Sequence, residues 1–164
     1  MNAKWVRALI ALGAVLVLGA LNASIVGKER IRRDGELVYL RLAPVDPRSL
    51  MQGDYMALRF ELAQVLLERS AGQRPREGET RVADVALDAQ RVASPAAATT
   101  ESSARIRLRY RIRNGQVWLG TNALFFEEGS AQRFNGARYG EFRVDRSSGE
   151  AVLVGLRDEA LRAL

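Results

Sequence analysis

Hydrophobic positions form one long uninterrupted run near the start of the chain and short alternating runs in the rest of it. No residue from 8 to 27 is charged. About 20 helical residues rise roughly 30 Å, which is the thickness of the hydrocarbon core of a bilayer. The run therefore predicts a transmembrane helix that contacts the lipid bilayer through residues 8–27.

A cleaved secretory signal is the alternative for this segment. Cleavage would follow Ala23, but Leu21 would then occupy a position usually held by a small residue, and the hydrophobic stretch is long for a signal. A buried core helix fits less well, because a helix that is apolar on every face is unusual in a domain this small. We expect residues 1–27 to be an N-terminal membrane anchor or a signal segment.

Charged residues flank the hydrophobic run on both sides. Lys4 and Arg7 precede it and favour a cytoplasmic N-terminus, whereas Lys28 and three nearby arginines follow it and oppose that orientation. The anchor and the signal interpretations both place the rest of the chain across the membrane. We therefore expect residues 28–164 to form one domain on the outer side, since 164 residues suit a single core.

Alternating runs predict strands in this domain, and residues 61–70 predict a short helix. The clearest strand is 105–113, where arginines alternate with apolar residues, and Asn114-Gly115 after it predicts a hairpin. Small and polar residues at about 89–104 predict a flexible loop. The fold class is mainly β: a single transmembrane helix followed by an antiparallel β sandwich or small barrel with one short helix. The predicted strands are 36–43, a run beginning at 55, 81–88, 105–113, 116–119, 139–144 and 151–156.

Composition narrows the possible chemistry. The chain has no histidine and no cysteine, which excludes the commonest general base, a thiol nucleophile and a thiolate metal site. The net charge is +6, but the 19 acidic residues are interspersed with the basic ones, so we expect no nucleic-acid partner. The arginines of strand 105–113 suggest an anionic or lipid-phosphate ligand, although a solvated sheet face explains them more simply.

The stretch from Ala43 to Phe60 contains an elaborate turn that leads into the strand beginning at residue 55. Ser49 with Lys28 could form a serine-lysine dyad, and Asp46 with Asp54 and Glu127 or Glu128 could bind a hard cation. The simpler interpretation is that the acids cap turns and pair with arginines such as Arg48 and Arg59. We therefore assign no catalytic, cofactor-binding or metal-binding residue, and we expect no cofactor.

The residues from Gly53 to Phe60, GDYMALRF, resemble the pattern of the GDYXXLXY protein family. Phe60 replaces the final tyrosine of that pattern, which supports a packing role for its ring. Two further blocks, 44–50 and 125–129, and the hydrophobic N-terminus also resemble the family, so the likeness covers most of the chain. The motif residues, of unknown role, are Pro44, Asp46, Pro47, Arg48, Gly53, Asp54, Tyr55, Leu58, Phe60, Phe126, Glu127 and Gly129.

The resemblance implies a bacterial envelope protein that works beside an integral membrane protein, but it implies no activity, since the family has no known function. We expect a single-pass protein of the bacterial inner membrane with its bulk on the periplasmic or outer side. Our leading hypothesis is a non-enzymatic accessory domain that docks on an integral membrane protein through the turn from Asp46 to Asp54, and tethering would favour that contact. The alternative is an envelope hydrolase that uses carboxylates or a serine near Ser49 to Asp54.

Overall fold

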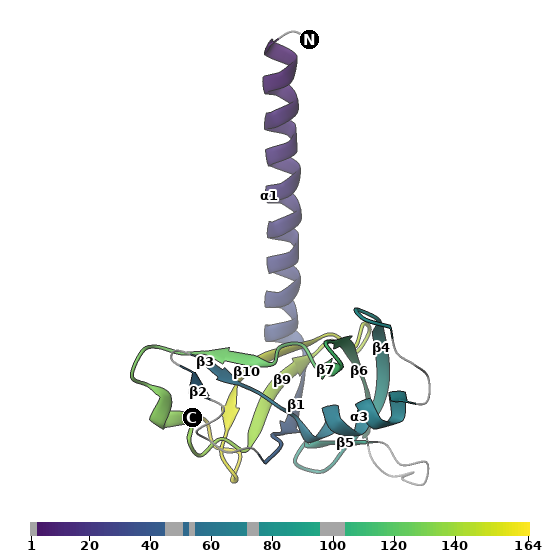
Figure 1. The fold of residues 1–164 in the computed structure, drawn as a ribbon, viewed down its shortest axis with the longest axis vertical. Helices are drawn as coiled ribbons and strands as arrows, with labels where there is room; N and C mark the ends of the chain where they lie inside the picture. The colour runs from purple at the N-terminus through teal and green to yellow at the C-terminus, as the bar shows by residue number, and fades with distance from the viewer. Residues whose placement is uncertain (1–2, 45–50, 53–54, 72–75, 96–103) are drawn as a thin grey trace.

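A single helix extends away from the rest of the molecule. The computed structural model describes residues 3–44, 51–52, 55–71, 76–95 and 104–164. Helix α1 (Ala3–Asp34) has 32 residues, none of them buried (Figure 1). It is longer than the predicted span of 8–27 because the charged sequence from Lys28 to Asp34 is rich in Lys, Glu and Arg, which favour helix.

The helix joins the domain through one residue, Gly35, which leads directly into strand β1 (Glu36–Arg41). The Gly35 N–H donates a hydrogen bond to the Ile31 carbonyl at 2.8 Å. A Cβ at position 35 would lie 2.4 Å from that carbonyl oxygen and 3.0 Å from the backbone nitrogen of Val144. Only glycine allows so close an approach, and the helix is therefore seated on the domain without an intervening linker.

Two antiparallel sheets form most of the domain. The first has the order β1–β9–β10, with β9 (Tyr139–Val144) in the centre and β10 (Ala151–Arg157) at the edge. The second has the order β5–β4–β6–β7. Its strands are β4 (Thr80–Leu87), β5 (Ala93–Pro95), β6 (Ala104–Arg113) and β7 (Gln116–Trp118).

These two sheets are connected on both sides. On one side Tyr39 of β1 forms a bridge with Val92, just before β5. On the other side the Arg109 N–H donates to the Gly149 carbonyl, in the β9–β10 turn, at 2.7 Å. The strands thus form a half-closed barrel, which confirms the predicted antiparallel β fold of sandwich or small-barrel type.

A third, smaller sheet lies to one side of the helix axis (Figure 1). It has the order β2–β3–β8, formed by Met51–Gln52, Tyr55–Ala57 and Ala123–Phe125. A bridge between Leu42 and Phe60 ties the chain after β3 to the end of β1. The small sheet is therefore an extension of the barrel.

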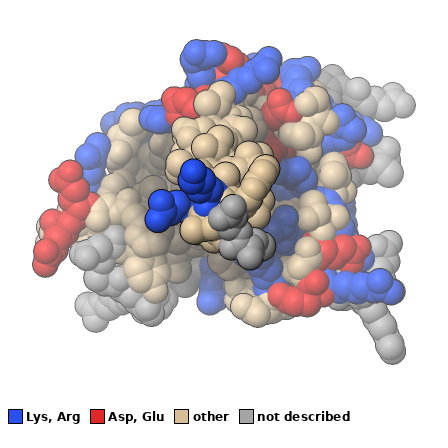
Figure 2. Space-filling view, turned by 90° about the horizontal axis from the view of Figure 1, so that it is seen from above, with Lys and Arg blue, Asp and Glu red and all other residues tan. Residues whose placement is uncertain are grey.

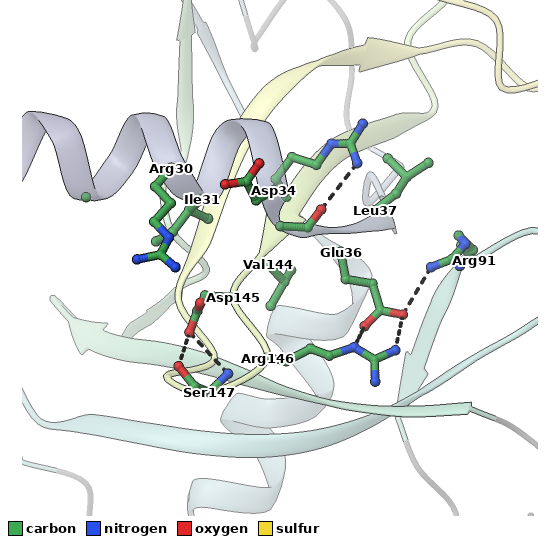
Figure 3. A pocket seen from close by; sticks show the side chains of 13 residues that line it. Arg30, Ile31, Asp34, Glu36, Leu37, Arg91, Val144, Asp145, Arg146 and Ser147 are labelled. Carbon is green, nitrogen blue, oxygen red and sulfur yellow. Dashed lines mark hydrogen bonds and ion pairs between the residues drawn. The ribbon is translucent and has the colours of Figure 1, made fainter.

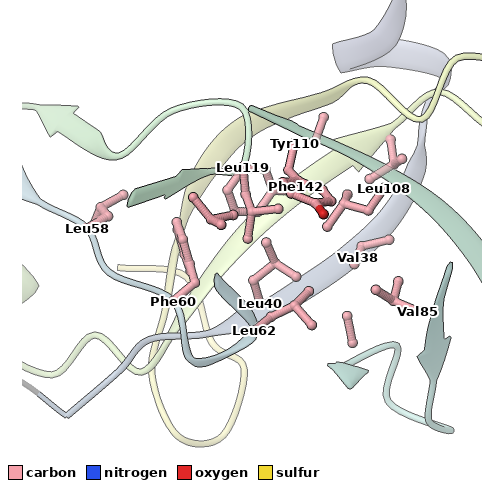
Figure 4. Close-up of a cluster of buried hydrophobic side chains, with 14 of the residues drawn as sticks. Val38, Leu40, Leu58, Phe60, Leu62, Val85, Leu108, Tyr110, Leu119 and Phe142 are labelled. Carbon is pink, nitrogen blue, oxygen red and sulfur yellow. The ribbon is translucent and has the colours of Figure 1, made fainter. Parts of the chain in front are cut away.

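Aliphatic and aromatic side chains from every sheet fill the barrel (Figure 4). Helix α3 (Glu61–Ala71) confirms the predicted short helix and adds Leu62 and Leu66, four residues apart on one face. The Ser70 hydroxyl is buried, donates to the Leu66 carbonyl at 2.7 Å and lies 3.2 Å from the Tyr110 hydroxyl. The largest fully buried side chains include Phe60, Phe142, Leu40, Leu58, Leu108, Leu119 and Leu156.

The prediction of a strand from residue 55 onward was too long. Met56, Leu58, Phe60 and Leu62 are all buried, as the alternation predicted. Nevertheless β3 ends at Ala57 and α3 begins at Glu61. Alternation therefore identified the buried positions correctly, but the chain turns from strand to helix while keeping those side chains in the core.

The predicted loop at about 89–104 contains a strand. Ala93–Pro95 form β5, which pairs with the end of β4, and β6 already begins at Ala104. Residues 96–103 lie outside the described residues. Small side chains pack weakly, but backbone pairing with β4 does not depend on their size. A short 3-10 helix, η1 (Ala131–Phe134), was also not predicted.

Candidate functional site

The motif residues that the structure describes gather around the small sheet β2–β3–β8. Tyr55 lies on β3, Leu58 and Phe60 follow it, and Phe126 comes directly after β8. Pro44 is exposed at the start of the turn. The remaining predicted positions of that turn lie outside the described residues: Asp46, Pro47, Arg48, Ser49, Gly53 and Asp54.

Phe60 is a core residue, with 1% of its surface exposed. Its ring meets the ring of Phe142 on β9 edge to face, with centroids 5.4 Å apart and an angle of 72°. Gly140, two residues before Phe142, makes room for both rings, because a Cβ there would lie 2.9 Å from each. This geometry confirms the packing role expected for the ring of Phe60.

Tyr55 and Phe125 form a second aromatic pair, on β3 and β8. Their rings are tilted at 41° with centroids 5.8 Å apart. Phe125 is 77% exposed, although it is a large apolar side chain in a family signature block. The small sheet therefore presents an aromatic surface to its surroundings, which we call the Phe125 surface (Tyr55 and Phe125).

The acidic pair after β8 lies in a turn. The N–H and the hydroxyl of Ser130 both donate to the Glu127 carbonyl, at 3.0 and 2.6 Å. The Phe126 ring packs on Phe134 of η1 at 5.3 Å, while the side chains of Glu127 and Glu128 are exposed. Within the described ranges, no three acidic side chains lie together as metal ligands would.

A groove of about 980 Å³ lies between the end of α1 and the turn that joins β9 to β10 (Figure 3). Its walls carry four arginines and three acidic residues. Figure 3 shows Glu36 between the guanidinium groups of Arg91 and Arg146. The charged residues that line the groove are Arg30, Asp34, Glu36, Arg91, Arg143, Asp145 and Arg146.

Two acids of this groove are fixed by their neighbours. Arg146 binds Glu36 through two nitrogens, at 2.6 and 2.9 Å, and Arg91 binds it at 3.0 Å. The hydrogen bonds from Arg146 hold the pKa of Glu36 below its ordinary value despite partial burial. Hydrogen bonds from Ser147 and Ser148 lower the pKa of Asp145 to about 2. The lowered pKa values favour the ionised carboxylate of both side chains, which serve here as structural contacts.

The lysine of the predicted dyad lies in an ion pair. The Lys28 amino group contacts the carboxylate of Glu150, which Arg109 also contacts at 2.6 Å. Ser49 lies outside the described residues, so the structure does not bring the two dyad residues together or separate them. The hydrolase alternative remains a prediction.

No pattern in the sequence predicted the groove. Glu36 is 55 residues from Arg91 and 110 residues from Arg146 along the chain. No local pattern connects positions so far apart, because the contact depends on how the two sheets close. The exposure of Phe125 was missed for a related reason, since Phe125 and Phe126 are adjacent and equally apolar.

A comparison with known protein families matched a part of the chain that includes all the motif residues. The sequence model of a family described as GDYXXLXY protein matches residues 17–156 of the 164-residue chain. No curated protein and no solved structure was found to match.

Proposed function

The chain belongs to the GDYXXLXY protein family, and we propose that it is a membrane-anchored accessory domain that docks on an integral membrane protein. The proposed location is the bacterial inner membrane, with α1 crossing the bilayer and the domain on the periplasmic or outer side. The Phe125 surface is the proposed contact with the partner.

The observation that carries this proposal is the exposure of α1. It is the helix of the described chain that is long and apolar enough to cross a membrane. Leu9, Val15 and Ile25 expose 60%, 66% and 65% of their surface. Removing apolar surface from water is worth roughly 25 cal/mol per Å², so these side chains favour lipid. A core helix would bury them inside the domain.

The joint at Gly35 supports docking on a partner in the same membrane. The Arg143 side chain donates to the Gly35 carbonyl at 3.2 Å. Lys28, near the end of α1, pairs with Glu150, which directly precedes β10. With α1 fixed in this way, the domain keeps one orientation relative to the bilayer. A partner in that bilayer would meet it at a raised effective concentration and with little loss of orientational freedom.

The Phe125 surface has the character of a protein contact. In the described part of the domain outside α1, the exposed large hydrophobic residues are Val82, at 54%, and Phe125, at 77%. Aromatic side chains are enriched among the residues that dominate binding energy in protein interfaces. Val82 lies on β4 among polar residues, which makes it a matched control.

The test is purification of the tagged full chain from native membranes in a mild detergent. We expect a membrane protein to copurify in stoichiometric amount, and Phe125→Ser to reduce its recovery, since loss of a central contact costs about 2 kcal/mol or more. Val82→Ser should leave recovery unchanged. Isolation of the chain alone, or equal losses in both variants, would contradict the proposal.

A further inference from the structure

The arginines of β6 form a continuous outer face of the barrel. Alternation along Ala104–Arg113 buries Ile106, Leu108, Tyr110 and Ile112 and directs the arginines outward. Arg107 donates to the carbonyls of the β9–β10 turn, at 3.1 Å for Ser147. The Arg107 side chain is therefore held by the β9–β10 turn.

The charges at the other end of β6 have weaker compensation. Arg109 shares Glu150 with Lys28, so one carboxylate faces two cations. The Arg111 Nε donates to the Thr80 hydroxyl at 3.3 Å, and the Arg113 guanidinium lies 5.9 Å from the centre of the Trp118 ring. Among the residues the structure describes, neither Arg111 nor Arg113 pairs with a carboxylate.

A cavity of about 230 Å³ opens at this place, and we call it the Arg113 pocket. Four cationic side chains and one carboxylate line it, together with the Trp118 ring. The five charged residues are Lys28, Arg109, Arg111, Arg113 and Glu150. Its net charge is therefore strongly positive, as expected for a site that takes an anion.

The position of the pocket relative to α1 identifies the anion. Lys28 is the first charged residue after the apolar run, so a bilayer that contains residues 8–27 would have its headgroups at the level of this pocket. Seen along α1 from its N-terminal end, Lys and Arg side chains lie on several sides of the helix, with Asp and Glu side chains among them (Figure 2). Because Lys28 of α1 itself lines the pocket, the pocket lies beside the end of the apolar run.

We infer that the Arg113 pocket binds the headgroup phosphate of an anionic phospholipid. The planar guanidinium groups of Arg111 and Arg113 match phosphate oxygens in charge and geometry, and Lys28 adds a third cation. Trp118 suits the headgroup region, where tryptophan is enriched. This inference rests on the proposed insertion of α1 in the bilayer, but it does not depend on any protein partner.

Trp118 provides a direct readout, because the chain has only one other tryptophan, Trp5. The full chain carrying Trp5→Phe is reconstituted in nanodiscs of phosphatidylcholine with increasing phosphatidylglycerol. We expect a saturable change in Trp118 emission that phosphatidylcholine alone does not give, weaker at high salt. Arg113→Gln should shift the midpoint roughly tenfold toward higher phosphatidylglycerol, as expected for loss of a charge-assisted hydrogen bond.

Arg133→Gln is the matched control, because Arg133 is also exposed and also lies 5.9 Å from an aromatic ring, that of Phe134. It should leave the midpoint unchanged. Equal shifts in both variants would overturn the inference in favour of unspecific surface attraction. An unchanged Trp118 emission would also overturn it, as would an equal response to inorganic phosphate added to phosphatidylcholine nanodiscs.

Flotation with phosphatidylcholine vesicles separates this inference from the proposed function. A chain that does not float with the vesicles contradicts membrane insertion itself, and the pocket inference falls with it. A chain that floats but shows no response to phosphatidylglycerol contradicts the pocket alone. Near-ultraviolet circular dichroism of each variant confirms that the domain remains folded.

Discussion

Two aromatic pairs that each include a residue of the family motif have similar ring spacing and opposite surroundings. Phe60 and Phe142 have centroids 5.4 Å apart and exposures of 1% and 0%. Tyr55 and Phe125 have centroids 5.8 Å apart, yet Phe125 is 77% exposed. One short motif thus contributes to two environments: its second half packs in the core of the barrel, and its first half, with β8, forms an exposed aromatic surface, which is the proposed contact with a partner.

The largest expected effect comes from the buried pair. Phe60→Ala should lower the free energy of unfolding by about 3–5 kcal/mol, because the cavity would open in a closely packed core. Urea unfolding of the full chain in mild detergent, followed by near-ultraviolet circular dichroism, measures this change. A loss below about 1 kcal/mol would remove the contrast between the two pairs.

Gly140 tests whether the buried pair is tightly packed. Gly140→Ala should destabilise the domain by about 1–3 kcal/mol, since the new Cβ would press on the rings of Phe60 and Phe142 at 2.9 Å. Gly155 on β10 is the control, because a Cβ there meets nothing within 4 Å. Equal changes in the two alanine variants would mean that the space around Phe60 is not limiting.

Acid should weaken the barrel at the β9–β10 turn, which contains neither aromatic pair. The pKa of Asp145 is lowered from 3.8 to about 2, so its carboxylate stabilises the folded domain above pH 3.8 and loses that contribution as the pH falls through about 2. Asp145→Asn should reduce the fall in melting temperature over this range. If the variant and the wild type lose stability in parallel, the β9–β10 turn does not contribute as its hydrogen bonds indicate.

The smallest effect on stability belongs to the exposed pair. Phe125→Ser should change the free energy of unfolding by no more than about 0.5 kcal/mol, as is usual for exposed positions. The same urea experiment measures it beside Phe60→Ala. A loss as large as that of Phe60→Ala would place Phe125 in the stabilising part of the fold and would remove the reason to assign it to a partner.

Local patterns predicted the elements that depend on neighbours in sequence. Asn114 and Gly115 have positive φ angles of 50° and 67° and join β6 to β7 as a two-residue hairpin, with Arg113 opposite Gln116. The hairpin of β9 and β10 and the N-terminal helix were predicted for the same reason, since periodicity and turn residues act over a few positions. Burial at Leu58 and Phe60 followed from alternation alone.

Contacts between distant segments could not be predicted in this way. The groove acid Glu36 meets Arg146 only after the two sheets close, and β5 forms only because β4 offers an edge. The sequence also gives no means to decide that Phe125 is exposed while Phe126 packs on Phe134. The candidate site was therefore located by its motif, but its division into buried and exposed parts required the structure.

The most direct test of membrane anchoring with the domain outside uses the absence of cysteine from the chain. Single-cysteine variants Ala3→Cys, on α1, and Gln90→Cys, in an exposed turn of the domain, are treated in spheroplasts with a membrane-impermeant maleimide. We predict that Gln90→Cys is labelled in intact spheroplasts and that Ala3→Cys is labelled only after permeabilisation. Labelling of Ala3→Cys alone in intact spheroplasts, or release of the protein from membranes by alkaline carbonate, would contradict the account.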